Sequence, residues 1–193
     1  MNPLSESSLA RANPCSAADV EAILREDGWL ASEITPEMKA WMHVAAAFLG
    51  PHVAARSVAL GDARSGLRDL LSLVFSYHAR TLLEDVNNQT VMAREGAREV
   101  IRELANRVLS ATPLEDARID SERYQRIVES LKASLHFRGR ELFHPVRLAL
   151  AGRVGEGELD RVILLLDGAA NLGFAASVKT TRARMIEFCA ALL

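Results

Sequence analysis

The chain has 193 residues, of which 49% are hydrophobic and 25% are charged, and its formal net charge is −2. This length suits one domain or two small helical ones, and the apolar fraction is large enough to bury a core. Gly and Pro are scarce, at 11 and 6 residues, and 5% of residues are aromatic, a composition that favours helix. The near-neutral charge argues against a strongly electrostatic binder of nucleic acid.

A membrane or secreted location is not expected from the sequence. No apolar run reaches the ~18 residues that a membrane-spanning helix needs, and residues 1–13 lack the charged start and apolar middle of a signal peptide. We therefore expect a cytoplasmic protein with no membrane partner. Cys15 and Cys189 lie at opposite ends without a CxxC spacing, so we expect neither a metal site nor a disulfide framework.

Charge is unevenly distributed along the chain. Residues 1–131 carry 14 basic and 19 acidic groups, a balance of −5, whereas residues 132–193 carry 9 basic and 6 acidic groups, a balance of +3. Of the 23 basic residues, 20 are Arg, which suits bidentate recognition of phosphates and bases. An Arg-rich composition can equally reflect a codon-biased genome.

The first part of the chain predicts two amphipathic helices. Ser16, with Asp19 three residues later, is typical of an N-cap and predicts a short helix that stops near Gly28. The sequence Thr-Pro-Glu at residues 35–37 predicts the start of a longer helix. Gly-Pro at residues 50–51 is expected to end or kink that helix.

A third helix is the clearest in the sequence. After a turn at residues 61–62, apolar side chains in residues 67–75 recur at the spacing of one helix face. Asn-Asn at residues 87–88 then marks a boundary. We therefore predict two packed helical subdomains, over residues 16–87 and 88–193.

The second part predicts five further helices, over residues 97–108, from a cap at Asp120 to Leu135, over 142–150, over 159–166, and from Phe174 to the end. In the last of these we expect an inward-facing stripe of Met185, Ile186, Cys189 and Leu192. No segment alternates with a period of two, so the predicted fold class is all-α without strands.

Motifs of enzyme chemistry are absent from the sequence. There is no Gly-rich phosphate loop, HExxH, GxSxG or CxxC, and the five His residues are scattered over predicted helices. Asp and Glu lie mainly on polar helix faces, where solvated surface charge is expected. We therefore predict no catalytic residue, no metal and no cofactor, and a helical enzyme of unrelated chemistry is the least favoured interpretation.

The most informative segment is residues 137–152, FRGRELFHPVRLALAG. It resembles the signature G-[KR]-x-L-F-x-P-[LV]-R-x-A-L-[TA]-G, which is found in the last helical domain of bacterial glutamyl-tRNA synthetases. The two patterns share a Pro, an Arg two residues after it, and a terminating Gly. The resemblance implies the anticodon-binding helical cage of a class I synthetase.

The resemblance extends over residues 19–172, weakly before residue 131. Residues 158–166 look like the helix that follows the signature in that family, and residues 35–38 and 56–62 look like its "TPE…ERAKTL" stretch. Residues 173–193 run past the usual end of the family.

The resemblance implies roles for three residues. Arg147 falls on an anticodon-reading position, Leu159 on a Leu that packs on an anticodon base, and Arg56 on the arginine that separates glutamate from glutamine anticodons. Two positions depart from the pattern, because Glu156 replaces a frequent Thr and Ala151 replaces the Thr before the terminal Gly. A carboxylate that faces an RNA backbone opposes binding.

Each assignment has a structural alternative. Arg147 offers both a planar group and hydrogen-bond donors to an unstacked RNA base, but it can instead pair with Glu141 or Glu103 on a solvated face. Leu159 can instead pack in the core. We expect the interior to hold Phe143, Leu148 and Leu150. We expect Arg138, Arg140 and Arg147 to be partly exposed on one face, and the candidate phosphate contacts are Arg138, Arg140 and Arg182.

The family's HIGH and KMSKS motifs do not occur in the chain, so we expect no aminoacylation by the chain alone. The resemblance implies a tRNA-binding module for a glutamate-type tRNA, acting in trans or with a separate synthetase catalytic chain, and no DNA partner. The alternative is a helical protein-interaction module that keeps the fold but has lost tRNA binding.

Overall fold

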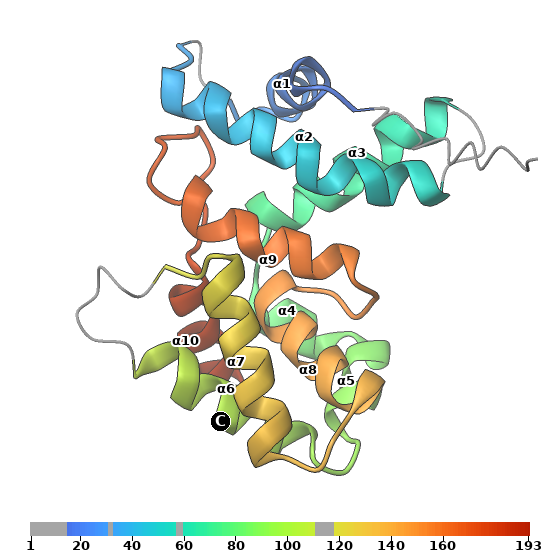
Figure 1. Ribbon diagram of the computed structural model, residues 1–193, viewed down its shortest axis with the longest axis vertical. Coiled ribbons are helices and arrows are strands. Elements are labelled where there is room, and N and C mark those ends of the chain that lie inside the picture. Colours follow the sequence, from blue (N-terminus) through green and yellow to red (C-terminus); the bar gives the residue numbers. More distant parts are fainter. Residues whose placement is uncertain (1–14, 31–32, 57–59, 111–117) are drawn as a thin grey trace, which may run out of the picture.

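The computed structural model describes residues 15–30, 33–56, 60–110 and 118–193, without the side chains of 55, 56 and 60–62. Over these residues the fold is all-α, as predicted, with ten helices and no strand (Figure 1). The helices are α1 Ala17–Glu26, α2 Pro36–Arg56, α3 Leu60–Phe75, α4 Ala79–Glu84, α5 Val86–Met92, α6 Ala97–Leu109, α7 Ser121–Ser134, α8 Gly139–Ala151, α9 Glu158–Ala169 and α10 Thr181–Ala191. None of these helices combines the length and the apolar character needed to span a bilayer.

Helix α9 joins two groups of helices. In Figure 1, α1, α2 and α3 lie together at the top, and α4 to α8 with α10 lie below. Helix α9 packs against α2 and α3 on one side and against α8 on the other, and α4 packs against α10. One continuous cluster of buried apolar side chains includes residues from both groups. The division at residues 87–88 stays a prediction, and α4 and α9 both pack across it.

The predicted N-caps are confirmed. The Ser16 hydroxyl accepts a hydrogen bond from the backbone N–H of Asp19, and the Asp19 carboxylate accepts one from the backbone N–H of Ser16. The Thr35 hydroxyl accepts from the Met38 N–H at 3.2 Å, and the Asp120 carboxylate accepts from the Arg123 N–H at 2.8 Å. These local signals placed the starts of α1, α2 and α7.

Two expected interruptions lie inside helices. Helix α2 continues through Pro51 to Arg56, although Pro removes a backbone hydrogen bond. Ala47 and Pro51 are both exposed, so water can reach the carbonyl that Pro leaves without a donor. Helix α3 already begins at Leu60, so residues 61–62 form its first turn rather than a separate one.

The Asn pair at residues 87–88 belongs to a helix start. Asp85 N-caps α5, because its carboxylate accepts hydrogen bonds from the N–H groups of Asn87 and Asn88 at 2.9 and 3.2 Å. Neither α4 nor α5 is among the helices predicted from the sequence. Both are short, at 6 and 7 residues, and neither is long enough to show a helical period clearly.

The last helix starts later than expected and turns a different set of side chains toward the core. Helix α10 begins at Thr181 with an N-cap at Thr180, so the prediction of a helix from Phe174 is wrong. Ile186 is 51% exposed, whereas Arg184 is fully buried. The predicted inward stripe is therefore wrong at Ile186, because Arg184 occupies the inner face.

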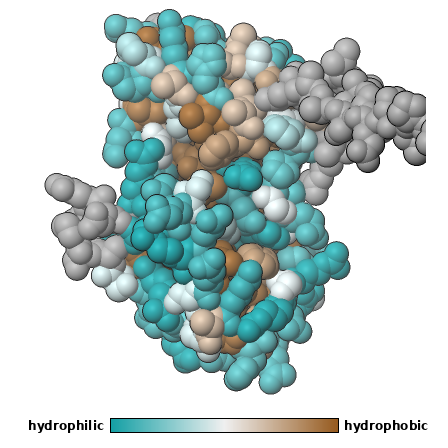
Figure 2. Space-filling view, viewed as in Figure 1, coloured by the Kyte–Doolittle hydropathy of each residue, from teal (hydrophilic) through white to brown (hydrophobic). Residues whose placement is uncertain are grey.

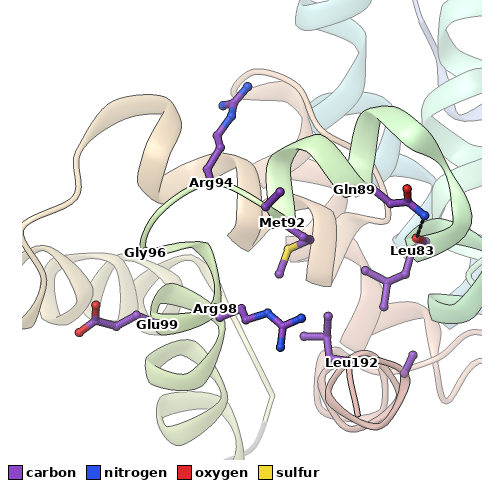
Figure 3. A pocket seen from close by; sticks show the side chains of 10 residues that line it. Leu83, Gln89, Met92, Arg94, Gly96, Arg98, Glu99 and Leu192 are labelled. Atoms are coloured by element: carbon purple, nitrogen blue, oxygen red, sulfur yellow. Dashed lines mark hydrogen bonds between the residues drawn. The ribbon is translucent and has the colours of Figure 1, made fainter.

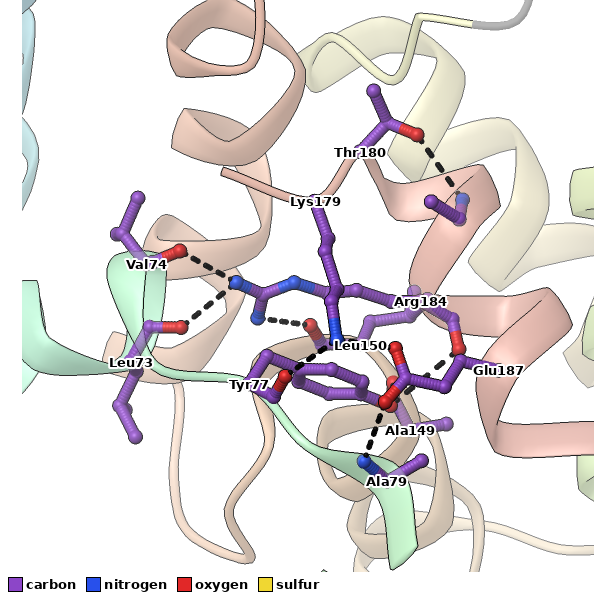
Figure 4. A network of polar contacts seen from close by, with 11 residues as sticks. Leu73, Val74, Tyr77, Ala79, Ala149, Leu150, Lys179, Thr180, Arg184 and Glu187 are labelled. Carbon is purple, nitrogen blue, oxygen red and sulfur yellow. Dashed lines mark hydrogen bonds and ion pairs between the residues drawn. The ribbon is translucent and has the colours of Figure 1, made fainter. Parts of the chain in front are cut away.

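Arg184 has no carboxylate partner among the described residues and is held by main-chain carbonyl groups (Figure 4). One Nη donates to the Leu150 carbonyl oxygen at 2.9 Å, and the other donates to the carbonyl oxygens of Leu73 and Val74 at 2.9 and 2.8 Å. The guanidinium carbon lies 4.5 Å from the centroid of the Tyr77 ring. Burial lowers the pKa of Arg184 to about 10, so it remains charged at neutral pH.

These carbonyl groups belong to the last turns of α3 and α8, where the helix dipole is negative and favours a cation. Arg184 therefore ties the C-terminal ends of both helices to α10. The Tyr77 hydroxyl donates to the Ala149 carbonyl at 2.6 Å. Lys179 pairs with Glu187 at 2.6 Å and donates to the Tyr77 carbonyl at 2.8 Å. Through these contacts the segment beyond residue 172 forms part of the core.

Candidate functional site

Arg147 lies in the second half of α8, against α9. Its side chain forms two parallel hydrogen bonds with Asp160, Nε to Oδ1 and Nη2 to Oδ2, both at 2.8 Å. Nη1 donates to the Gly155 carbonyl oxygen at 2.8 Å. The Tyr124 hydroxyl donates to Asp160 Oδ1 at 2.8 Å. The pair therefore connects α7, α8 and α9.

The expectation that Arg147 is partly exposed is wrong, since only 7% of the residue is accessible. Three of the five N–H donors of its guanidinium are used inside the fold, and one face lies 4.9 Å from the Phe143 ring centroid. Arg147 binds Asp160 and the Gly155 carbonyl instead of Glu141 or Glu103, the partners that the sequence suggested. In this arrangement Arg147 cannot read an anticodon base without breaking its pair with Asp160.

Of the other two residues implied to read the anticodon, the structure describes the side chain of Leu159 alone. Leu159 is fully buried in the core, which is the alternative that the sequence left open. The backbone of Arg56 ends α2, and its side chain lies outside the described residues. The interior positions expected for Leu148 and Leu150 are confirmed, and Phe143 is partly buried against the core.

Arg138 and Arg140 are exposed, as expected, at the start of α8. The Arg140 side chain is 77% exposed and lies 3.5 Å from Glu156. Arg138 donates to the carbonyl oxygens of Leu135 and Phe137 at 2.6 and 2.7 Å, which fixes its guanidinium against the turn between α7 and α8. Arg140 and Arg147 lie seven positions apart on one helix, but Arg140 is exposed at the start of α8, whereas Arg147 is buried and paired with Asp160 of α9.

Two further cations lie close to this turn. Lys132 Nζ lies 5.7 Å from the centroid of the Phe143 ring. The turn before α6 packs against the turn before α8, because a Cβ on Gly96 would lie 1.9 Å from the Phe137 ring. Gly96 also has a φ of +81°, a conformation that favours glycine. This close packing brings Arg94 to the same end of the molecule. We call Arg94, Lys132, Arg138 and Arg140 the cationic corner.

His144 reports the electrostatics of the cationic corner. Its Nδ1 atom is buried without a hydrogen-bond partner among the described residues. Burial lowers the pKa of His144, and the positive charges of Arg94 and Arg140 lower it further. Glu156 acts in the opposite direction. The imidazole is therefore neutral at pH 7 and adds no charge to the corner.

The corner combines cations with partly exposed rings. Phe137 and Phe143 are both partly buried against the core. Residues 132–144 contain three Lys or Arg and one acid, a balance of +2, although the whole chain carries −2. Exposed guanidinium groups beside aromatic rings can contact phosphates and stack on bases.

Arg182, the third candidate phosphate contact, is not part of this corner. Its Nη1 donates to the Leu109 carbonyl at the end of α6, whereas Gly96 and Phe137 meet at the start of α6. The 13 residues of α6 span about 20 Å. The structure therefore brings Arg138 and Arg140 together but places Arg182 apart. Arg94 was not predicted from the sequence, because it reaches the cationic corner only through the contact between the turn before α6 and the turn before α8.

A second accessible region lies between α2 and α9. A groove of about 350 Å³ is lined by residues that include His52, Tyr124, Arg161 and Leu164. On α2, Val44 is 43% exposed, and the Arg161 guanidinium lies 5.5 Å from the Phe48 ring centroid. Figure 2 shows apolar side chains gathered on the upper half of the face that it displays, at the level of α2 and α9.

The buried acid Asp167 has a structural role. Its carboxylate accepts hydrogen bonds from the backbone N–H of Ile119 and from the N–H and hydroxyl of Thr181, at 2.7 to 2.8 Å. It therefore fixes the approach to α7 and the start of α10 to the end of α9. With three donors it is not poised as a general base.

The chain was compared with models of protein families, with curated proteins and with solved structures, and none of them matches it.

Proposed function

We propose that this protein is an RNA-binding module whose ligand is a tRNA, and that the cationic corner is its contact surface. The observation that supports this most strongly is the convergence of Arg94, Lys132, Arg138 and Arg140 from three separate segments around Phe137 and Phe143. The choice of a tRNA, and of a glutamate tRNA in particular, rests on the resemblance of residues 137–152 to the synthetase signature.

The expected mode of binding follows from this surface. Lys and Arg contacts to phosphates supply most of the affinity of RNA-binding proteins, and aromatic rings supply stacking on unpaired bases. The corner offers four cations, and one of them, Arg140, is paired with Glu156. The net charge of the chain is −2, so we expect modest affinity that falls with salt. Arg147 and Leu159 have no place in this contact surface.

A protein-interaction module is the second candidate, and the region between α2 and α9 favours it. Val44 is exposed and Phe48 is partly exposed there, and exposed apolar surface is a common feature of protein contact sites. A separate synthetase catalytic chain is the partner that the resemblance suggests. This candidate uses a different surface, since the residues that line the groove between α2 and α9 do not include any cation of the cationic corner.

The test is a titration of labelled glutamate and non-cognate tRNAs with purified protein at 50 mM salt. The variant Arg138→Ala/Arg140→Ala removes two cations of the corner. The matched control, Arg25→Ala/Arg126→Ala, removes two exposed cations on α1 and near the start of α7. We expect the corner variant to lose affinity about 5- to 30-fold, corresponding to about 1–2 kcal/mol, and the control to stay near wild type.

Three outcomes decide the proposal. Selective loss in the corner variant supports it, and a preference for glutamate tRNA supports the ligand suggested by the resemblance. Equal loss in both variants contradicts it, because the attraction is then a property of total charge. No binding by the wild-type protein at 50 mM salt removes the RNA-binding proposal and leaves the interaction module.

A further inference from the structure

A groove of about 580 Å³ lies between the end of α5, the start of α6 and the end of α10 (Figure 3). Its apolar lining includes Leu83, Met92, Ala191 and Leu192. The volume falls within the range of about 300–1,000 Å³ that small-molecule sites occupy. Helix α10 belongs to residues 173–193, so this wall of the groove lies beyond the resemblance to the synthetase signature.

Arg98 is the polar group at the centre of the groove. Figure 3 shows its side chain extending from α6 toward Leu192, and Met92 lines the same groove. Arg98 forms no ion pair or side-chain hydrogen bond with any described residue, whereas Arg102, one turn later, lies 3.8 Å from Glu99. An unpaired guanidinium over an apolar floor favours a ligand that carries both a negative charge and an apolar or aromatic part.

The lining suits the two parts of a nucleotide. A guanidinium plane stacks on aromatic rings and also binds phosphate bidentately, and a methionine thioether packs well against ring edges. Arg94 lies at the rim and points away from the centre of the groove (Figure 3), where it can contact a neighbouring phosphate. The acid that lines the groove, Glu99, also points away from its centre.

The groove is continuous with the cationic corner. Arg94 belongs to both, and Gly96, which lines the groove, packs against the Phe137 ring at the corner. An RNA strand bound along the corner therefore reaches the groove within a short distance. We propose that the groove binds one nucleotide, with its base against Met92 and Arg98 and its phosphate beside Arg94. The assignment of this nucleotide to a bound RNA strand rests on the proposed function.

The test uses two probes, AMP and tRNA, on the full chain. Amide resonances of Ala191 and Leu192, followed by NMR, report occupancy of the groove by AMP. We expect AMP to shift these resonances in the wild-type protein and in Arg102→Ala, but not in Arg98→Ala. We also expect Arg98→Ala to lower the affinity for tRNA at least about threefold, and Arg102→Ala to leave it near wild type. Arg98 is exposed, so the fold should survive both changes.

A second variant tests the groove independently of Arg98. Leu192→Glu places a carboxylate in the groove, and we expect it to lower tRNA affinity about tenfold while circular dichroism shows an intact fold. If tRNA binds but neither Arg98→Ala nor Leu192→Glu weakens it and AMP shifts nothing, the groove proposal is wrong and the corner proposal stands. If AMP shifts the groove resonances but tRNA does not bind, the groove binds a free nucleotide and the RNA-binding function is wrong. Binding of an acidic peptide in place of AMP would overturn the nucleotide assignment.

Discussion

The Arg147 guanidinium and the Asp160 carboxylate form two parallel hydrogen bonds of 2.8 Å between α8 and α9. Tyr124 on α7 adds a third contact to the same carboxylate. Burial in the protein, together with the negative charge of Asp160 and the hydrogen bond to it, raises the pKa of Tyr124 well above its usual value. The Arg of the FHPVRLALAG segment is therefore a clamp between three helices.

The first prediction concerns this clamp. Replacing Arg147 with Ala leaves the partly buried Asp160 carboxylate without its cation, and we expect a loss of about 2–4 kcal/mol in the free energy of unfolding. Urea denaturation measures it. The control is Arg126→Ala, whose partner Glu122 is highly exposed, so that its loss should stay below about 0.5 kcal/mol. Equal stability of the two variants would show that the Arg147 pair does not hold the helices.

The second prediction concerns Arg184. Replacing it with Met keeps most of the buried volume but leaves the carbonyl oxygens of Leu73, Val74 and Leu150 without their donor. We expect a loss of about 2–4 kcal/mol in the free energy of unfolding, measured by thermal and urea denaturation. Ile186→Ala on the exposed face of the same helix should change it by less than about 0.5 kcal/mol. A stable Arg184→Met protein would contradict the role of Arg184 in joining α3, α8 and α10.

The features that could be predicted from the sequence are those that depend on residues close together in the chain. Ser16, Thr35 and Asp120 cap helices through contacts three residues away, and the caps could therefore be read directly. The apolar stripe of α3 also depends only on spacing along one helix. The same reasoning failed at Pro51, because the cost of a Pro depends on whether water reaches the freed carbonyl.

Contacts between residues far apart in the sequence determine the features that could not be predicted. The resemblance around Arg147 implies an anticodon-reading role and gives no hint of its partner, because Asp160 approaches Arg147 only when α9 packs on α8. Arg184 faces inward because carbonyl groups from two other helices satisfy it, and hydropathy alone favours Ile186 there. Arg94 joins the cationic corner through a packed turn. Each of these placements depends on how helices pack rather than on the sequence near the residue.

The third prediction concerns His144 and pH. Its folded-state pKa lies below the ordinary value of 6.5, so the folded protein binds fewer protons than the unfolded chain in this range. The stability contributed by neutral His144 is therefore present above about pH 6.5 and lost as the pH falls through the lowered pKa. We expect His144→Gln to show a smaller loss of unfolding free energy between pH 7.5 and 5 than the wild type. Identical pH profiles would contradict an unfavourable protonation at this site.

The fourth prediction concerns Glu156, which lies 3.5 Å from Arg140. Glu156→Gln removes a negative charge from the cationic corner and frees Arg140, so we expect tRNA affinity at 50 mM salt to rise about 2- to 5-fold. Glu122→Gln removes a more exposed carboxylate that pairs with Arg126 and should have little effect. A rise of the same size in both variants would indicate a response to net charge alone.

The most direct test of the RNA-binding account is the salt dependence of tRNA affinity. Each phosphate contact to a single strand contributes about −0.7 to the slope of log affinity against log salt concentration. Between 50 and 200 mM salt, Arg138→Ala/Arg140→Ala should make this slope shallower by about 1.4, because two contacts are lost. Arg25→Ala/Arg126→Ala should keep the wild-type slope. Equal slopes for all three proteins would contradict a contact between the cationic corner and the RNA backbone.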